Sequence, residues 1–75
     1  SLGRAIMTDK YLVCVAKNKI KIWDIANWEL CAEAKAFGTL FFDEGFIYLT
    51  DRNISGVAIF TIDDIIKDIN AIENN

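Results

Sequence analysis

The fold of this chain is decided by a stretch that occurs twice. Residues 20–25 read IKIWDI, and residues 57–62, which lie 37 positions further along, read VAIFTI. The stretches ahead of them also match, residues 6–18 with residues 40–53, where the second copy has one extra residue. A period of this size is typical of a stacked array of small supersecondary units. Such units rarely bury their own apolar faces, so the repeat also predicts contact with further protein.

Length and composition support the same expectation. A chain of 75 residues forms at most one small domain. A domain of this size buries only about 60% of the surface of its unfolded chain. Yet 53% of the residues are hydrophobic and only 25% are charged. We therefore expect apolar faces that are shared with other protein, either the remaining units of a longer chain or identical chains.

Charge and residue types exclude several classes of partner and chemistry. The net charge of −3 argues against a nucleic-acid partner, because such proteins carry basic patches. The chain has no histidine, the commonest general base and metal ligand. No apolar run approaches the roughly 18 residues that a membrane span needs, so no membrane partner is expected.

The two cysteines bear on the compartment. Cys14 and Cys31 are too few for a disulfide scaffold, and their spacing fits no metal motif. We expect two reduced thiols that are not bonded to each other, as in a cytoplasmic protein. The chain begins with Ser1 rather than Met, so the lack of a signal peptide says little about location.

Local patterns predict seven short strands. Residues 11–16 form a continuous apolar run without polar alternation, which indicates a strand covered on both faces. Asn18 follows it in a tight turn and is expected in the left-handed conformation. The expected strands cover residues 4–8, 11–16, 20–25, 28–37, 40–42, 46–50 and 57–61.

Residues 28–37 allow two interpretations. Alanine, glutamate and lysine favour a helix. The period-2 pattern fits better, because it places one apolar set on one face and Glu29, Glu33 and Lys35 on the other. The apolar set is Trp28, Leu30, Ala32, Ala34 and Ala36. We predict an edge strand whose alanines pack closely on what lies beneath.

The repeat breaks where a further strand is due. Isoleucines at positions 62, 65, 66, 69 and 72 have helical spacing. Thr61 and Asp64 form an N-terminal capping signal, so the helix is expected to begin near Asp63. The single unit of residues 1–75 is thus mainly β: a four-stranded repeat over 4–37, an incomplete three-stranded repeat over 38–62, and an amphipathic helix over 63–73.

Residues 13–25 resemble the second and third strands of a WD-repeat β-propeller blade, closed by the Trp23-Asp24 dipeptide. Residues 45–60 are more similar to the looser Tyr-Val-Thr-Asn type of propeller repeat, which also occurs in lactonase-like propellers. The resemblance covers about residues 4–62. It implies two antiparallel propeller-type blades, with Trp23 packed between neighbouring blades. The short second blade resembles the C-terminal end of a larger propeller.

Two features of the WD family are missing. Ala36-Phe37 stands where a Gly-His pair usually precedes the blade, and Lys17 replaces the aspartate of the tight turn. The buried polar network of the family therefore cannot form here. The resemblance implies a degenerate propeller unit.

Three functions follow as hypotheses. The first is a non-catalytic protein-binding or scaffold module, with Trp28 and Arg52 as candidate partner contacts because both fall at turns or loops. The second is the structural part of a lactonase- or hydrolase-like propeller enzyme with its catalytic residues elsewhere. Such an enzyme should offer polar loop groups such as Asp51 and Asn53. The third is a unit that closes a homo-oligomeric ring.

No residue is assigned to catalysis, a cofactor or a metal. The adjacent acids at 43–44 and 63–64 are expected at a turn and at the start of the helix. A catalytic carboxyl pair needs one buried member with a raised pKa. The chain is therefore expected not to be an enzyme.

Overall fold

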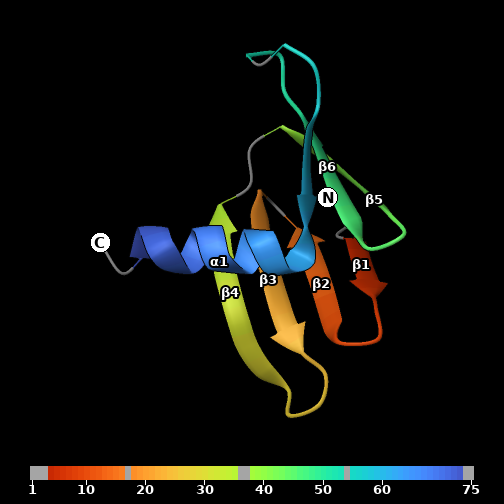
Figure 1. Cartoon of the computed structure of the whole chain (residues 1–75), viewed down its shortest axis with the longest axis vertical. Coiled ribbons are helices and arrows are strands. Elements are labelled where there is room, and N and C mark those ends of the chain that lie inside the picture. The colour runs from red at the N-terminus through yellow and green to blue at the C-terminus, as the bar shows by residue number, and fades with distance from the viewer. Residues whose placement is uncertain (1–3, 17, 36–37, 54, 74–75) are drawn as a thin grey trace.

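The computed structural model describes residues 4–16, 18–35, 38–53 and 55–73, and the fold is mainly β. Seven antiparallel strands and a C-terminal helix follow one another along the chain, as Figure 1 shows. The elements are β1 (Arg4–Met7), β2 (Tyr11–Ala16), β3 (Lys19–Asp24), β4 (Glu29–Lys35), β5 (Thr39–Asp43), β6 (Phe46–Thr50), β7 (Ala58–Thr61) and α1 (Ile62–Glu73).

The strands form two meanders. The first sheet has the order β1-β2-β3-β4 and the second the order β5-β6-β7, so each strand pairs with its neighbour in sequence. The order of four strands, three strands and a helix confirms the sequence prediction. Asn18 has a φ of 62°, as its turn requires. Glu44 and Gly45 have φ values of 48° and 84° and form the tight β5–β6 turn.

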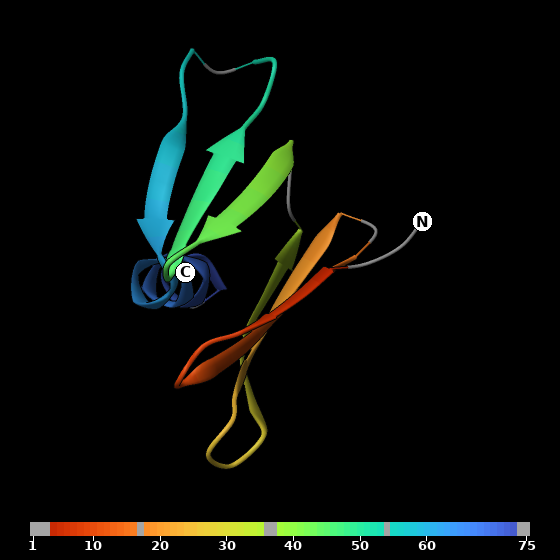
Figure 2. The same ribbon diagram turned by 90° about the vertical axis from the view of Figure 1, so that its right-hand side faces the viewer.

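The second sheet and α1 together cover one face of the first sheet. α1 crosses β3 and β4, and it contacts both β4 and β7 (Figure 1). The two sheets diverge from each other like an open V, as Figure 2 shows from the side. We call the facing sides of the two sheets the inner faces. The opposite sides are the outer faces.

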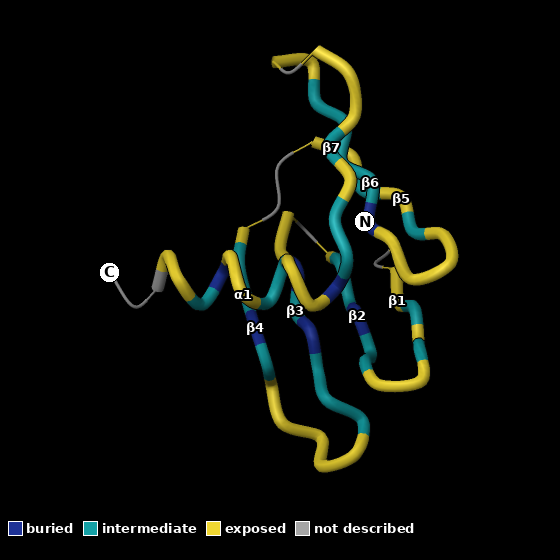
Figure 3. The backbone as a smooth tube through the Cα atoms, in the orientation of Figure 1, coloured by how far each residue is buried: buried dark blue, intermediate teal, exposed yellow. Residues whose placement is uncertain are grey.

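The core lies between the inner faces and α1. Val13, Ile22 and Ile47 are fully buried, and α1 contributes Ile62 and Ile69. In Figure 3 the buried positions form a band across β2, β3 and β4, close to where α1 crosses the sheet. One compact apolar cluster therefore joins both repeats.

α1 begins at Ile62, one residue before the predicted start. The Thr61 hydroxyl accepts a hydrogen bond of 3.1 Å from the backbone N–H of Asp64, which caps the first turn. The helix lies on the alanines of β4: Ala32 is buried and Ala34 packs against the same cluster. The predicted close packing is confirmed at Ala32, whereas Ala34 borders a hollow of about 330 Å³ beside the helix. Ala36, the third alanine of the prediction, lies outside the described residues.

β4 is an edge strand as predicted, but its alternation is broken. Trp28 lies in the turn before the strand, and a β-bulge between the pairs Ile22–Ala32 and Trp23–Leu30 inserts one extra residue. A bulge reverses the phase of the side chains. Leu30 therefore shares the outer face with Trp23, and the predicted common face of Leu30 and Ala32 is wrong. The predicted strand end at residues 36–37 lies outside the described residues.

The cysteines are free, as predicted. Cys14 pairs in register with Lys21 on the outer face, whereas Cys31 packs against the core. Burial raises the pKa of the Cys31 thiol above its ordinary value. The two thiols therefore lie in different surroundings of the same sheet.

Candidate functional site

The two predicted contact residues lie far apart. Trp28 is 56% exposed in the β3–β4 turn, and Arg52 is exposed in the loop between β6 and β7. Figure 1 shows this turn at the bottom of the molecule and this loop at the top. The structure does not bring the two residues into one site.

Trp28 sits in an unusual backbone conformation. Its φ is 57°, in the left-handed region that a bulky residue rarely adopts. The turn is closed by a 2.7 Å hydrogen bond from the N–H of Trp28 to the carbonyl of Asp24. The side chains of Asp24 and Asn27 accept further bonds from the N–H groups of Ala26 (2.8 Å) and Glu29 (3.0 Å). These bonds fix the backbone of the turn that carries the exposed indole.

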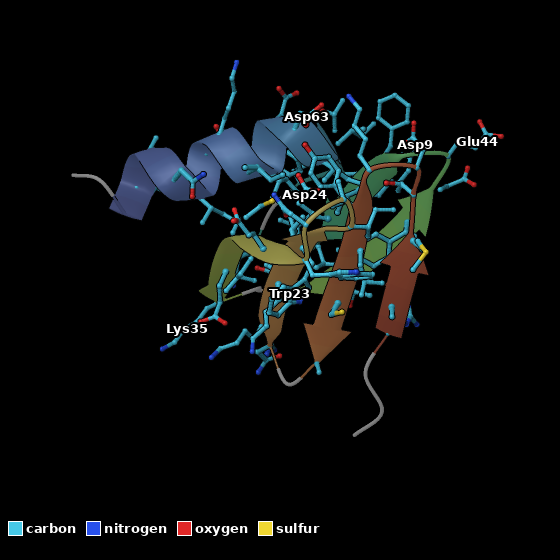
Figure 4. The ribbon with its side chains drawn as sticks, turned by 90° about the horizontal axis from the view of Figure 1, so that it is seen from below. Asp9, Trp23, Asp24, Lys35, Glu44 and Asp63 are labelled. Atoms are coloured by element: carbon cyan, nitrogen blue, oxygen red, sulfur yellow. The ribbon has the colours of Figure 1, made fainter. Side chains whose placement is uncertain are left out.

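A row of apolar side chains crosses all four strands of the first sheet on its outer face. The strand register pairs Met7 with Leu12, Leu12 with Trp23, and Trp23 with Leu30. We call these residues the four-stranded outer row. Figure 4 shows Asp24 on the helix side of this sheet and Trp23 on the opposite side. Met7 is 62% and Leu30 43% exposed at the two ends of the row, and Leu12 and Trp23 between them are half-buried.

A matching row crosses the outer face of the second sheet. The register pairs Phe41 with Tyr48 and Tyr48 with Ile59, and these three residues form the three-stranded outer row. Phe41 is 49% and Ile59 58% exposed. Phe46, on the same face, is 43% exposed. Large aromatic and aliphatic side chains thus lie side by side in contact with solvent.

Next to the four-stranded outer row, the outer face becomes polar. Glu33 forms ion pairs with Lys21 at 3.4 Å and with Lys19 at 3.7 Å. Both pairs are exposed to solvent, so each contributes little to stability. The lysines also line a shallow hollow of about 490 Å³ together with Cys14 and Ala16.

A polar contact ties the first sheet to the start of α1. The Tyr11 hydroxyl donates a 2.6 Å hydrogen bond to a carboxylate oxygen of Asp63. This bond and the partial burial of the phenol raise the pKa of Tyr11 from its ordinary value of 10.0 to about 12. Both residues line a hollow of about 250 Å³ with the β1–β2 turn. The contact joins β2 to the first turn of α1, so we assign it a structural role.

Within residues 4–16, 18–35, 38–53 and 55–73, no three acidic, histidine or cysteine side chains gather as metal ligands. In the same ranges, α1 is the only helix, and at 12 residues it is too short to cross a membrane. Glu44 lies in a turn, and Asp63 and Asp64 lie in the first helical turn, as expected. Asp43, which was expected in the same turn as Glu44, is the last residue of β5.

The outer rows are candidate contact residues that the sequence analysis did not assign, apart from Trp23. One pattern in the sequence indicates them. The apolar run over residues 11–16 predicts a strand covered on both faces, and Leu12 is one of its outward residues. No pattern in the sequence indicates the bulge that turns Leu30 outward.

The chain was compared with protein families, curated proteins and solved structures. No family model, curated protein or solved structure shows a significant match to it.

Proposed function

We propose that the protein is a non-catalytic protein–protein interaction and scaffold module that stacks on other protein through the outer faces of its two sheets. The observation that carries this proposal is the pair of exposed apolar rows, one on each outer face. Contiguous exposed apolar side chains on a small protein often mark an interaction surface. Here two rows with large exposed apolar side chains occur on opposite sides of one small chain.

The direction of the rows supports stacking between sheets. Each row runs across the strands, through every strand of its sheet. Packed sheets bury side chains from such rows at a separation of about 10 Å. The proposed partner is therefore another sheet, such as a neighbouring blade of a β-propeller to which the sequence has a resemblance.

The place of α1 supports the same architecture. The second sheet has three strands, and α1 follows β7 directly and packs on β4. A fourth strand of the second sheet would face β4 in the same way. The helix thus takes the place of that strand in the chain and packs on β4 at the C-terminal end of β7.

Two further parts of the proposal concern location and contacts. The free thiols Cys14 and Cys31 support a reducing, cytoplasmic setting. Trp28 and Arg52 lie at opposite ends of the molecule, where each would contact a partner separately. An exposed tryptophan on a turn with a hydrogen-bonded backbone is well suited as an anchor.

The test compares dye binding of the wild-type chain with that of a variant in which four exposed row residues are changed: Met7→Lys, Leu30→Lys, Phe41→Lys and Ile59→Lys. The control, Ala26→Lys/Ala71→Lys, changes exposed residues outside both rows. Dilute folded wild type and control should bind the uncharged dye Nile red, and the four-residue variant should bind much less of it. Equal dye binding by wild type and the four-residue variant would contradict the proposal.

A further inference from the structure

The strand registers show which residues of the two repeats are equivalent. Ile22 of the first stretch corresponds to Ile59 of the second by sequence. Ile22 pairs with Val13, and Ile59 pairs with Tyr48, so Val13 corresponds to Tyr48. In the next strand pair Ile6 pairs with Val13, and Phe41 pairs with Tyr48, so Ile6 corresponds to Phe41.

This correspondence exchanges inner and outer faces. On the inner face of the first sheet the register defines a row, the four-stranded inner row, of Ile6, Val13, Ile22 and Ala32. Its equivalents in the second repeat form the three-stranded outer row. A side chain that is buried in one repeat therefore has an exposed counterpart in the other: Ile22 is 0% and Ile59 58% exposed.

The other two rows correspond in the same way. The three-stranded inner row consists of Phe42, Ile47 and Phe60. Its equivalents in the first repeat are Met7, Leu12 and Trp23, which belong to the four-stranded outer row. The interface inside the chain has two halves, and each half has a copy on the opposite outer face.

We infer that the three-stranded outer row of one chain docks on the four-stranded outer row of a second copy of the same chain. This inference rests on the proposed function and names its partner. A second copy brings the missing half of each interface in the arrangement that already packs inside the chain. The contact is heterologous, head to tail, so it extends to a ring when the rotation closes and to a filament when it does not.

The outer contact is less apolar than the inner one. Beside the four-stranded outer row lie Cys14, Lys21 and Glu33, and the repeat equivalents of Cys14 and Lys21 on the inner face are Leu49 and Ala58. Burying the ion pair of Lys21 and Glu33 would cost desolvation free energy. The docked faces therefore meet along the apolar rows and leave the charged end in water, so the association is reversible.

The test uses two variants, each with one face blocked. Met7→Lys/Leu30→Lys blocks the four-stranded outer row, and Phe41→Lys/Ile59→Lys blocks the three-stranded one. All four residues are exposed, so the core is untouched, and circular dichroism checks the fold. The control Ala26→Lys/Ala71→Lys carries the same charge change off both rows and should associate like the wild type. Solution mass is measured by light scattering.

Each blocked variant alone should be a monomer, because its free face finds no complementary one. An equimolar mixture should form a 1:1 heterodimer of twice the 8.5 kDa chain mass and nothing larger. A blocked variant that dimerises alone would overturn the inference, because like faces would then pair, while the proposed function would stand. A mixture that stays monomeric would also overturn it. Dye binding by the wild type then decides whether the proposed function falls too.

Discussion

The inner and outer faces of the two sheets carry rows of similar residues that differ in what covers them. On the inner faces Val13, Ile22 and Ile47 are fully buried under the opposite sheet and α1. On the outer faces the equivalent residues are less covered: Leu12 and Tyr48 are half-buried, and Ile59 is 58% exposed. This difference is what we expect if the chain is one part of a stack of which a single interface lies within it.

A second difference lies beside the rows. The inner faces continue with apolar pairs such as Leu40–Leu49 and Val15–Ile20, whereas the outer face of the first sheet continues with Lys21 and Glu33. The inner interface is therefore the more apolar of the two surfaces. The proposed outer contact would separate more readily, because charged groups border it.

The largest effect is expected from two isoleucine substitutions at equivalent positions. Ile22→Ala should lower the free energy of unfolding by about 2–5 kcal/mol, because it leaves a cavity in a fully buried site. Ile59→Ala should lower it by less than about 1 kcal/mol, because its side chain is largely hydrated in the single chain. Urea unfolding followed by circular dichroism measures both. Equal losses would remove the distinction between inner and outer faces.

The next effect concerns the joint between the two repeats. Gly38, which directly precedes β5, has a φ of 74°, and a Cβ atom there would collide with the carbonyl oxygen of Thr50 and lie 2.9 Å from the Cβ of Asp51. Gly38→Ala should therefore cost about 2 kcal/mol or more in unfolding free energy. Gly45→Ala is the matched control, since Gly45 also has a positive φ but open space around it. A loss no greater at Gly38 than at Gly45 would show that the close approach of Gly38 to the end of β6 does not limit the residue at this position.

Trp28 is exposed like the row residues, but it lies in a turn outside both outer rows, so its substitution tests whether exposure alone causes association. Trp28→Gly should raise the free energy of unfolding by about 0.5–1 kcal/mol, because glycine adopts the positive φ without strain. Asn18→Gly should change little, because asparagine tolerates the same region. Self-association should persist in Trp28→Gly, since the residue lies outside both outer rows. Thermal melts and solution mass measure the two effects, and loss of association would place Trp28 in the docking surface.

The smallest effect concerns the contact between Tyr11 and Asp63 on the inner side. The folded state raises the pKa of Tyr11 from 10.0 to about 12, so it favours the neutral phenol. This contribution to stability is fully present below pH 10 and is lost as the pH rises from 10 to about 12, where the unfolded chain loses the proton first. Tyr11→Phe should remove that part of the pH dependence. We would measure the free energy of unfolding of both proteins from pH 9 upward. The same change with pH in wild type and Tyr11→Phe would contradict the role of this bond.

Much of the fold follows from local patterns in the sequence. The β-branched runs, the turn residue Asn18 and the isoleucine spacing of α1 are each encoded within a few residues, and the structure has them where the patterns place them. The side of Leu30 could not be predicted, because a bulge depends on pairing across two strands. The outer rows could not be predicted either, because they are defined by the register of all strands in each sheet. Trp28 and Arg52 were expected as contacts from their turns alone, and their separation in space has no signature in the sequence.

The most direct test of the central claim is light scattering of the purified wild-type chain over a series of concentrations. We expect a mass above that of the 8.5 kDa chain, which rises with concentration as the outer rows of successive copies meet. A monodisperse monomer with a cooperative thermal melt at every concentration would contradict the claim. The chain would then close its own core as a small α+β sandwich, with its outer rows as ordinary surface.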